Sequence, residues 1–485
     1  MWEGADPALK RRLLWGGYAL LIAFAVLFFC TKSSPGYPIN DWADANIYLT
    51  IGRGMTQGQV VYRDLYDHKG PLLYMLHAAC ALLDGFTGVF IMEVLFAAAF
   101  LLCAKRLLDV YGAGRAAWAL LPLLALAVYA SVSFAEGDSA EEMCLPMIMA
   151  TLWGVCAFLQ SGKDRLSTRS LVLHGWLVGN VFWVKFTLVG AQAGLLGFVL
   201  LRHAFRREWK SLFHSVLYLL AGFGLSTLPW ILYFGIHGAI GDWLRVYLYD
   251  NLFLYSAGES AGLLSRVKAM LVCGMDWLIQ NLRYTLLIAL GLVWFALREK
   301  QTRTAVWLMA ALGALAVFAG GKSYAYYGLA LAGMTALGLI PLGRLMERAP
   351  RWLPAASLAL CLAACPLISH NMNADYGAPI FSPKEETMQH RIAAQIPEGA
   401  TLLNYGFMDA GFYTAAGVVP QVKYFHQTNV PLQEMLTEQR RYVEEGLCDY
   451  VVTRAPLENA RYELVTQTES PAFWYETVYL YRRIV

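Results

Sequence analysis

The sequence predicts an all-α polytopic membrane protein with about eleven transmembrane helices and a small C-terminal α/β domain. The chain has 485 residues, of which 58% are hydrophobic and only 15% are charged, whereas soluble globular proteins carry about a quarter charged residues. Long apolar runs recur from residue 13 to residue 369. After Pro383, charges become frequent and apolar residues alternate with polar ones, as in a soluble domain.

Eleven segments contain roughly the 20 mostly apolar residues that a membrane-spanning helix needs. Basic residues Lys10, Arg11 and Arg12 precede the first segment, and every second connection after it is also basic. Because such residues stay on the cytoplasmic side, we expect a cytoplasmic N-terminus and a C-terminal part outside the cell membrane. The segments are 13–31, 86–104, 116–134, 142–160, 171–186, 187–202, 212–234, 282–298, 304–321, 325–343 and 352–369.

The chain is predicted to contain two units. Residues 1–370 form the transmembrane module, with a first outer loop over 32–85 and a second outer loop over 135–141. Residues 371–485 form an extracytoplasmic α/β domain, long enough for a small hydrophobic core.

Two outer segments are predicted to lie at the membrane surface. Pro71–Leu83 is apolar but too short to span, and its initial proline favours a helix that begins there. The connection over 235–281 carries many tyrosines and tryptophans, which prefer the headgroup level.

The C-terminal tail has the alternation of a mixed α/β domain. The predicted helices cover residues 383–396 and 431–446. The predicted strands cover Thr401–Tyr405, Asp449–Thr453, Arg461–Thr466 and Trp474–Tyr481.

Charge and cysteine content exclude some classes of function. The net charge of +3 and the lack of a basic stripe interleaved with aromatic residues argue against a nucleic-acid partner. Nine cysteines are present, but none has C-x-x-C spacing, so we interpret them as apolar thiols and assign no metal ligand.

The first half of the first outer loop carries two acids, Asp41 and Asp44, and Tyr48 follows Asp44 by four residues. On a helix, Asp44 and Tyr48 share one face. A carboxylate in a cleft beside the membrane has its pKa pushed toward neutrality and suits a general base. The alternative is that both acids are solvated and cap a helix.

The second half of this loop carries Tyr62, Arg63, His68 and Lys69. Lys69 directly precedes the predicted surface helix, where an ammonium group can meet a lipid phosphate. The alternative is that Lys69 anchors the helix at the interface by snorkelling.

The second outer loop is acidic and leads into Glu141 and Glu142. These acids favour either the positioning of an acceptor or the binding of a divalent cation by oxygen ligands, although short outer loops are often simply polar. Lys185 and Lys322 lie at outward turns and are either part of an anion site or interface anchors.

A longer pattern in the first outer loop resembles the GT-C superfamily of membrane glycosyltransferases. The nearest branch is the bacterial protein mannosyltransferase and aminoarabinose transferase type, which is glycosyltransferase family 39-like. The resemblance rests on Asp44-x-x-x-Tyr48-x-x-x-Gly52-x-x-Met55-x-x-Gly58, followed by Tyr62-x-Asp64-x-x-Asp67-His68-Lys69-Gly70-Pro71-Leu72-x-Tyr74.

The resemblance implies an enzyme that transfers a sugar from a polyprenyl-phosphate donor to a hydroxyl on the outer face, with inversion. Asp44 matches the catalytic aspartate of the family, although the acid that usually follows it is Ala45 here. The implied catalytic set is completed by Glu141 or Glu142. The lysine that the family carries before the surface helix matches Lys69, which is expected to bind the donor phosphate. From their charge and position, we predict that Arg63, Lys322 and Lys185 add to this phosphate site. The predicted substrate-binding residues are Asp41, Tyr48, Tyr62 and His68.

The acceptor implied by the resemblance is a glycan, a lipid or a protein, in contact with membrane lipids. No cofactor is assigned, and the binding of a divalent cation is left open.

Two other classes of protein compete with a transferase. A transporter or flippase of lipid-linked sugars predicts charges near mid-membrane and related halves, whereas the charges here gather at the outer ends. A non-catalytic membrane scaffold is the other class, and it predicts no reason for Asp44 and Lys69 to act together.

Overall fold

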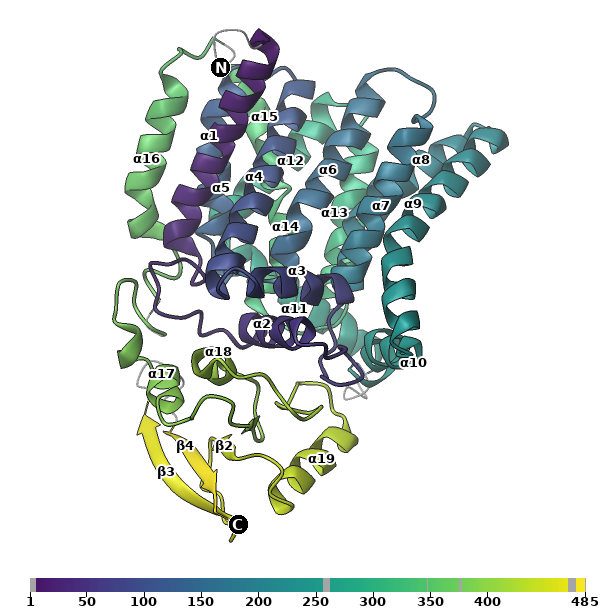
Figure 1. Ribbon diagram of the computed structural model, residues 1–485. Helices are drawn as coiled ribbons and strands as arrows, with labels where there is room; N and C mark the ends of the chain where they lie inside the picture. The colour runs from purple at the N-terminus through teal and green to yellow at the C-terminus, as the bar shows by residue number, and fades with distance from the viewer. Residues whose placement is uncertain (1–5, 256–261, 347, 375–376, 470–476, 485) are drawn as a thin grey trace.

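The computed structural model describes residues 6–255, 262–346, 348–374, 377–469 and 477–484. Figure 1 shows a bundle of long helices, with the N-terminus at one end and the α/β domain beyond the other end. The bundle contains α1 (Pro7–Cys30), α4 (Phe86–Val110), α5 (Ala116–Tyr129), α6 (Ala140–Gln160), α7 (Thr168–Lys185), α8 (Gly190–Phe205), α9 (Trp209–Ile236), α12 (Leu282–Arg298), α13 (Arg303–Phe318), α14 (Leu329–Ala332), α15 (Thr335–Leu345) and α16 (Leu353–Ile368).

The bundle is that of a multi-pass membrane protein. By length and composition, five stretches of the described chain suffice to cross a membrane, or up to seven if each bent helix pair counts as one span. The longest stretch, Thr168–Phe205, turns back on itself: Lys185 contacts Glu141 at the start of α6, whereas Arg202 lies over Phe158 near the end of α6. Each of the eleven predicted segments falls on helix, while their number as true spans stays a prediction.

Two helices of the first outer loop lie across the end of the bundle, between the bundle and the α/β domain (Figure 1). They are α2 (Ala43–Thr56) and α3 (Pro71–Ala81), and α3 is the helix predicted over Pro71–Leu83. The two helices approach closely because Gly52 has no side chain: a Cβ there would lie 2.5 Å from the backbone carbon of His77.

In its described residues, the connection predicted as one interfacial loop over 235–281 contains more helix than expected. It contains α10 (Ile240–Trp243), the π-helix η3 (Leu244–Leu254) and α11 (Leu263–Gln280). At Asn281 the chain turns by 106° into α12. The Asn281 side chain fixes this corner, because it donates to Trp277 O and accepts from Ser133 N.

Strands lie in all four predicted regions of the C-terminal domain, and they form one mixed sheet. The strand order is β1-β2-β4-β3, with β1 parallel to β2 and the other pairs antiparallel. The predicted start of the last strand, 474–476, lies outside the described residues, and α18 and the break between η5 and α17 were not predicted. The elements are β1 (Leu402–Asn404), β2 (Tyr450–Thr453), β3 (Tyr462–Glu469), β4 (Thr477–Arg483), η5 (Lys384–Glu386), α17 (Met388–Ala393), α18 (Phe412–Ala416) and α19 (Gln433–Glu444).

Short 3₁₀ turns join several bundle helices: η1 (Val132–Phe134) precedes α6, η2 (Phe186–Val189) joins α7 to α8, and η4 (Ala325–Gly328) precedes α14.

The α/β domain docks on the first outer loop. Tyr66 N donates to Lys423 O over 2.9 Å, and Arg53 donates to the carbonyl of Thr414.

Candidate active site

Asp44 lies in the first turn of α2, where the helix dipole favours a negative charge. Its Oδ2 atom accepts a hydrogen bond of 2.9 Å from Tyr48 OH, one turn further along the helix. The same oxygen lies 3.6 Å from Lys69 Nζ. Both contacts therefore use the same carboxylate oxygen.

The backbone around Lys69 is held by buried tyrosines. Tyr62 OH donates to Lys69 O over 2.6 Å, and Lys69 N donates to Tyr74 OH over 2.9 Å. Tyr62, which the sequence suggested as a substrate contact, is fully buried and supports this backbone. The next residue, Gly70, donates from its N–H to Val184 O at the end of α7.

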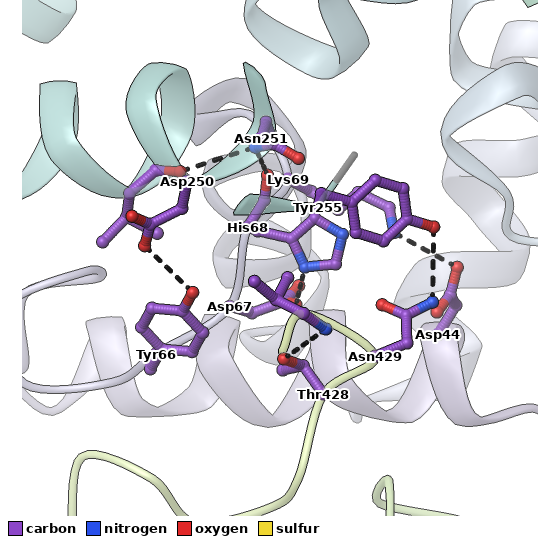
Figure 2. A network of polar contacts seen from close by, with 12 residues as sticks. Asp44, Tyr66, Asp67, His68, Lys69, Asp250, Asn251, Tyr255, Thr428 and Asn429 are labelled. Atoms are coloured by element: carbon purple, nitrogen blue, oxygen red, sulfur yellow. Dashed lines mark hydrogen bonds and ion pairs between the residues drawn. The ribbon is translucent and has the colours of Figure 1, made fainter. Parts of the chain in front are cut away.

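Asp67 and His68 precede the lysine and face the same region (Figure 2). His68 Nδ1 lies 3.2 Å from Asp67 Oδ1, and Tyr74 OH donates to Asp67 Oδ2 over 2.5 Å. Burial raises the pKa of Asp67, but His68 and Lys69 outweigh burial and lower it overall. Burial and the charge of Lys69 lower the pKa of His68, so its ring is neutral at pH 7.

Three lysines converge on one cavity of about 280 Å³. Lys69, Lys185 and Lys322 line it, from the first outer loop, the end of α7 and the segment after α13. Burial lowers the pKa of Lys69, but the charges of Asp44 and other acids outweigh burial and raise it. Lys69 therefore carries its positive charge at neutral pH.

The other two lysines lie over aromatic rings, and Lys185 also contacts an acid. Lys185 Nζ lies 2.6 Å from Glu141 Oε1 and 3.9 Å from the centre of the Tyr327 ring. Lys322 Nζ lies 3.4 Å from the centre of the Tyr255 ring. Cations over aromatic faces are stabilised by the ring quadrupole.

The same cavity has an apolar side. Its lining includes Phe186 and Leu188 of η2 and Ala316 and Val317 of α13. The cavity thus combines a cationic end with an apolar wall and suits a ligand with an anionic head and a hydrocarbon chain.

Some predicted site residues lie elsewhere. Asp41 forms a buried pair with Lys32 at 2.7 Å. Arg63 is exposed and donates to Asp64 and His237 O. Neither Asp41 nor Arg63 lines the cavity, whereas His68 does.

Glu142 faces a buried acidic cluster behind the cavity. Asp138 N donates to Glu142 Oε2 and to Glu93 Oε1, each over 2.9 Å. The Asp138 carboxylate contacts His77 Nε2 at 3.0 Å. Glu93 is fully buried and accepts a hydrogen bond from Thr31. Within the described ranges, no group of three or more His, Cys, Asp or Glu side chains is arranged to hold a metal ion.

Sequence reasoning missed two asparagines that complete the site (Figure 2). Asn251 Nδ2 donates to His68 O over 2.7 Å and lines the cavity. Asn429, from the α/β domain, lies 3.4 Å from both Tyr255 OH and Tyr324 OH. The rings of His68 and Tyr255 stack with centres 5.3 Å apart. The aromatic residues near Lys322 in the sequence could have indicated that aromatic rings contribute to the site. The sequence around Asn429 contains no pattern that indicates a role for this residue.

The helical bundle, the surface helices and the α/β domain together form a fold that is also seen in solved structures. Similar solved structures are those of ArnT from Cupriavidus metallidurans. ArnT bound to undecaprenyl phosphate matches with a TM-score of 0.56 and 14% sequence identity, over 98% of each chain. ArnT in the apo state matches with a TM-score of 0.55 and 13% identity, again over 98% of each chain.

Sequence comparisons add little to this likeness. A family model described as TraX protein matches residues 251–385, from η3 to η5. That region contains Lys322 but neither Asp44 nor Lys69. No curated protein matches the chain.

Proposed function

We propose that the protein is a membrane glycosyltransferase that moves a sugar from a polyprenyl-phosphate donor to an acceptor hydroxyl. The observation that carries this proposal is the contact between Asp44 and Lys69 beside a cavity with three lysines. A carboxylate that accepts a proton and cations that hold a phosphate are the groups that such a transfer needs.

The donor would place its phosphate among Lys69, Lys185 and Lys322, which offer charge-assisted hydrogen bonds. Its prenyl chain would follow the apolar wall beside Leu188 and Val317. The likeness in fold to ArnT, which has been crystallised with undecaprenyl phosphate, supports this choice of donor.

The reaction is a displacement at the anomeric carbon. The acceptor oxygen forms the new bond while the bond from the anomeric carbon to the phosphate oxygen breaks, which inverts the configuration. Asp44 takes the proton of the acceptor hydroxyl, and the electron pair stays on the leaving phosphate, where Lys69 stabilises it. Tyr48 orients Asp44 by its hydrogen bond to Oδ2.

We propose supporting roles for the remaining predicted residues. Glu141 holds Lys185 in the cavity through their 2.6 Å contact. Glu142 fixes the second outer loop through Asp138 N. Asp41 and Arg63 stabilise the first outer loop at a distance from the reacting groups.

The test is sugar transfer by purified protein supplied with a panel of polyprenyl-phosphate sugars. Asp44→Asn removes the base, and we expect transfer to fall about 10²- to 10⁴-fold. Lys69→Ala should weaken donor binding and slow transfer as well. Asp64→Asn is the matched control, because Asp64 lies in the same loop but pairs with Arg63 at the surface. Transfer by Asp44→Asn at the rate of the unmodified protein would exclude this mechanism.

A further inference from the structure

A second cavity, the α6–α7 cavity, lies at the end of the bundle away from the α/β domain (Figure 1). Its volume is about 580 Å³, within the range of small-molecule sites. It is formed by the end of α6, the connection from α6 to α7, the start of α7, and His214 of α9. It shares no lining residue with the lysine cavity, to which α7 contributes Lys185 from its other end.

The α6–α7 cavity carries positive charge. Lys163 and Arg165 line it, and among its described lining residues no acid is present. Asp164 stands between them in the sequence, but its side chain is 89% exposed and contacts Arg206 at 4.0 Å instead. The cavity therefore attracts an anion.

The start of α7 adds hydrogen-bonding groups to these cations. Ser167 caps the helix, because its hydroxyl accepts a hydrogen bond from Ser170 N, and both residues line the cavity. Thr168 also lines it, and its Oγ1 atom lies 3.2 Å from His214 Nε2. The positive end of the dipole of this 18-residue helix favours an anion in the same place.

A buried histidine at the floor of the cavity gives an independent indication of a ligand. His174 lies one turn beyond Ser170 on α7 and is only 3% exposed, and its Nδ1 atom has no hydrogen-bond partner within the described chain. The ring occupies the space in front of Gly154, which lines the cavity: a Cβ there would lie 2.7 Å from His174 Nε2. Buried polar groups without partners are rare in native proteins. A ligand that reaches Gly154 meets this ring and can give it a partner.

We propose that the α6–α7 cavity binds a phosphate group. Basic residues alone would not indicate a site, because the positive-inside rule also predicts them at this connection. Hydroxyl groups, a helix start and the unpartnered His174 accompany them here, and a phosphate has several oxygens that accept charge-assisted hydrogen bonds. This inference goes beyond the proposed function and does not depend on it.

The phosphate has two possible sources, which are the headgroup of a membrane lipid and free phosphate in solution. Phe158 and Leu166 give the cavity an apolar part that suits the start of an acyl chain. Arg202 of α8 lies over the Phe158 ring, 5.6 Å from its centre, and adds a cation at this level of the bundle. The experiment therefore compares the two sources directly.

The test measures occupancy of the cavity by the labelling of Ser170→Cys with a maleimide. The full-length protein is kept in dodecyl maltoside, a detergent without phosphate, and receives a short-chain phosphatidic acid, inorganic phosphate, a short-chain diacylglycerol, or sodium chloride at equal ionic strength. Background labelling is low because the native cysteines are buried, except for the half-buried Cys103. Gln301→Cys, exposed on the basic connection between α12 and α13, is the control position.

We expect phosphatidic acid to slow labelling of Ser170→Cys about tenfold when present at about ten times its Kd, with no effect on Gln301→Cys. Equal protection by inorganic phosphate would identify a site for the phosphate itself, and protection by phosphatidic acid alone would identify a lipid headgroup; either result confirms the inference. Protection by the diacylglycerol or by sodium chloride, or by none of the additions, would overturn it.

Charge variants separate a built site from general attraction to a basic surface. In the Ser170→Cys background, Lys163→Gln combined with Arg165→Gln should raise the half-protecting concentration at least about tenfold, because charged hydrogen bonds are lost. Lys300→Gln combined with Arg303→Gln removes the same charge from the connection between α12 and α13 and should leave that concentration unchanged. Equal effects of the two pairs would overturn the inference.

His174→Phe tests the floor of the cavity with a ring that cannot form hydrogen bonds. We expect it to raise the half-protecting concentration about threefold to tenfold through one lost hydrogen bond. An unchanged concentration would overturn the site as described, because its phosphate would then not reach Gly154.

Discussion

At the scale of single residues, two ion pairs beside the cavity differ in how tightly they are closed. Lys185 and Glu141 approach to 2.6 Å, a fully formed charge-assisted contact. Lys69 and Asp44 remain 3.6 Å apart although both are largely buried. In the proposed reaction, this looser pair lets Lys69 turn toward the leaving phosphate while Asp44 takes the proton of the acceptor.

Glu136, in the second outer loop, gives a prediction about pH. Burial raises its pKa from 4.5 to about 6. A raised pKa makes the carboxyl stabilise the fold below pH 4.5, and this contribution is lost as the pH rises through 6. The shift corresponds to about 2 kcal/mol, which partial exposure of the side chain reduces to about 1 kcal/mol.

We therefore expect Glu136→Gln to be more stable than the unmodified protein by about 1 kcal/mol at pH 8 and equal to it at pH 4. Thermal unfolding in detergent across this pH range measures the difference. Glu458→Gln, on the exposed surface of the α/β domain, should show no such trend. A stabilisation that is the same at both pH values would contradict the assignment.

The sequence drew attention to several residues that the structure brings together, including Lys185 and Lys322 from segments far from the first outer loop. Asp44 and Lys69 each lie beside the start of a helix. The sequence pattern there and the expected position near the membrane surface both indicated a functional role for these two residues. The choice between Glu141 and Glu142 stayed open because consecutive helical residues point in different directions and only packing selects one. Asn429 was missed because it contacts Tyr255, at the cavity, from a loop that is distant in the sequence, and no local pattern reveals such a contact.

At the scale of elements, the first outer loop and the end of α7 approach so closely that only glycine fits between them. A Cβ on Gly70 would lie 2.0 Å from Trp183 O, and Gly70 N donates to Val184 O over 3.0 Å. This contact fixes the spacing between Lys69, on the loop, and Lys185, at the end of the helix.

We expect Gly70→Ala to separate these elements and weaken donor binding, with a loss of about 1–3 kcal/mol in stability from overpacking. Gly197→Ala is the control, because Gly197 lies within α8 with no atom within 4 Å of an added Cβ. Alanine should be neutral or stabilising there. Donor affinity and Tm are measured for both variants, and equal behaviour of the two would exclude the role of Gly70.

Helices and strands whose sequence gives one clear signal of secondary structure were predictable. Those whose sequence gives two competing signals were not. Pro71 followed by an apolar run identified α3 because proline suits the first turn of a helix. The helix α11 was assigned to a loop because it lacks the uniform hydropathy of a span. Its corner at Asn281 depends on the contact with Ser133, which is distant in sequence.

At the scale of the whole molecule, the α/β domain and the N-terminus lie at opposite ends of the helical bundle (Figure 1). Asp409 helps to hold the domain there, because it accepts hydrogen bonds from Thr50 Oγ1 of α2 and from Asn404 Nδ2. The lysine cavity, the surface helices and the domain therefore lie at the same end of the helical bundle. Hydropathy predicted the domain itself but not this docking, which depends on pairs far apart in sequence.

This arrangement predicts the sidedness of the protein. Basic residues such as Lys163, between α6 and α7, should lie in the cytoplasm, and Glu458 of the α/β domain should lie outside. A membrane-impermeant maleimide should label Glu458→Cys in intact cells and Lys163→Cys only after permeabilisation, since both positions are exposed. The opposite pattern would place the lysine cavity where nucleotide sugars are available, and a lipid-linked donor would then no longer be required.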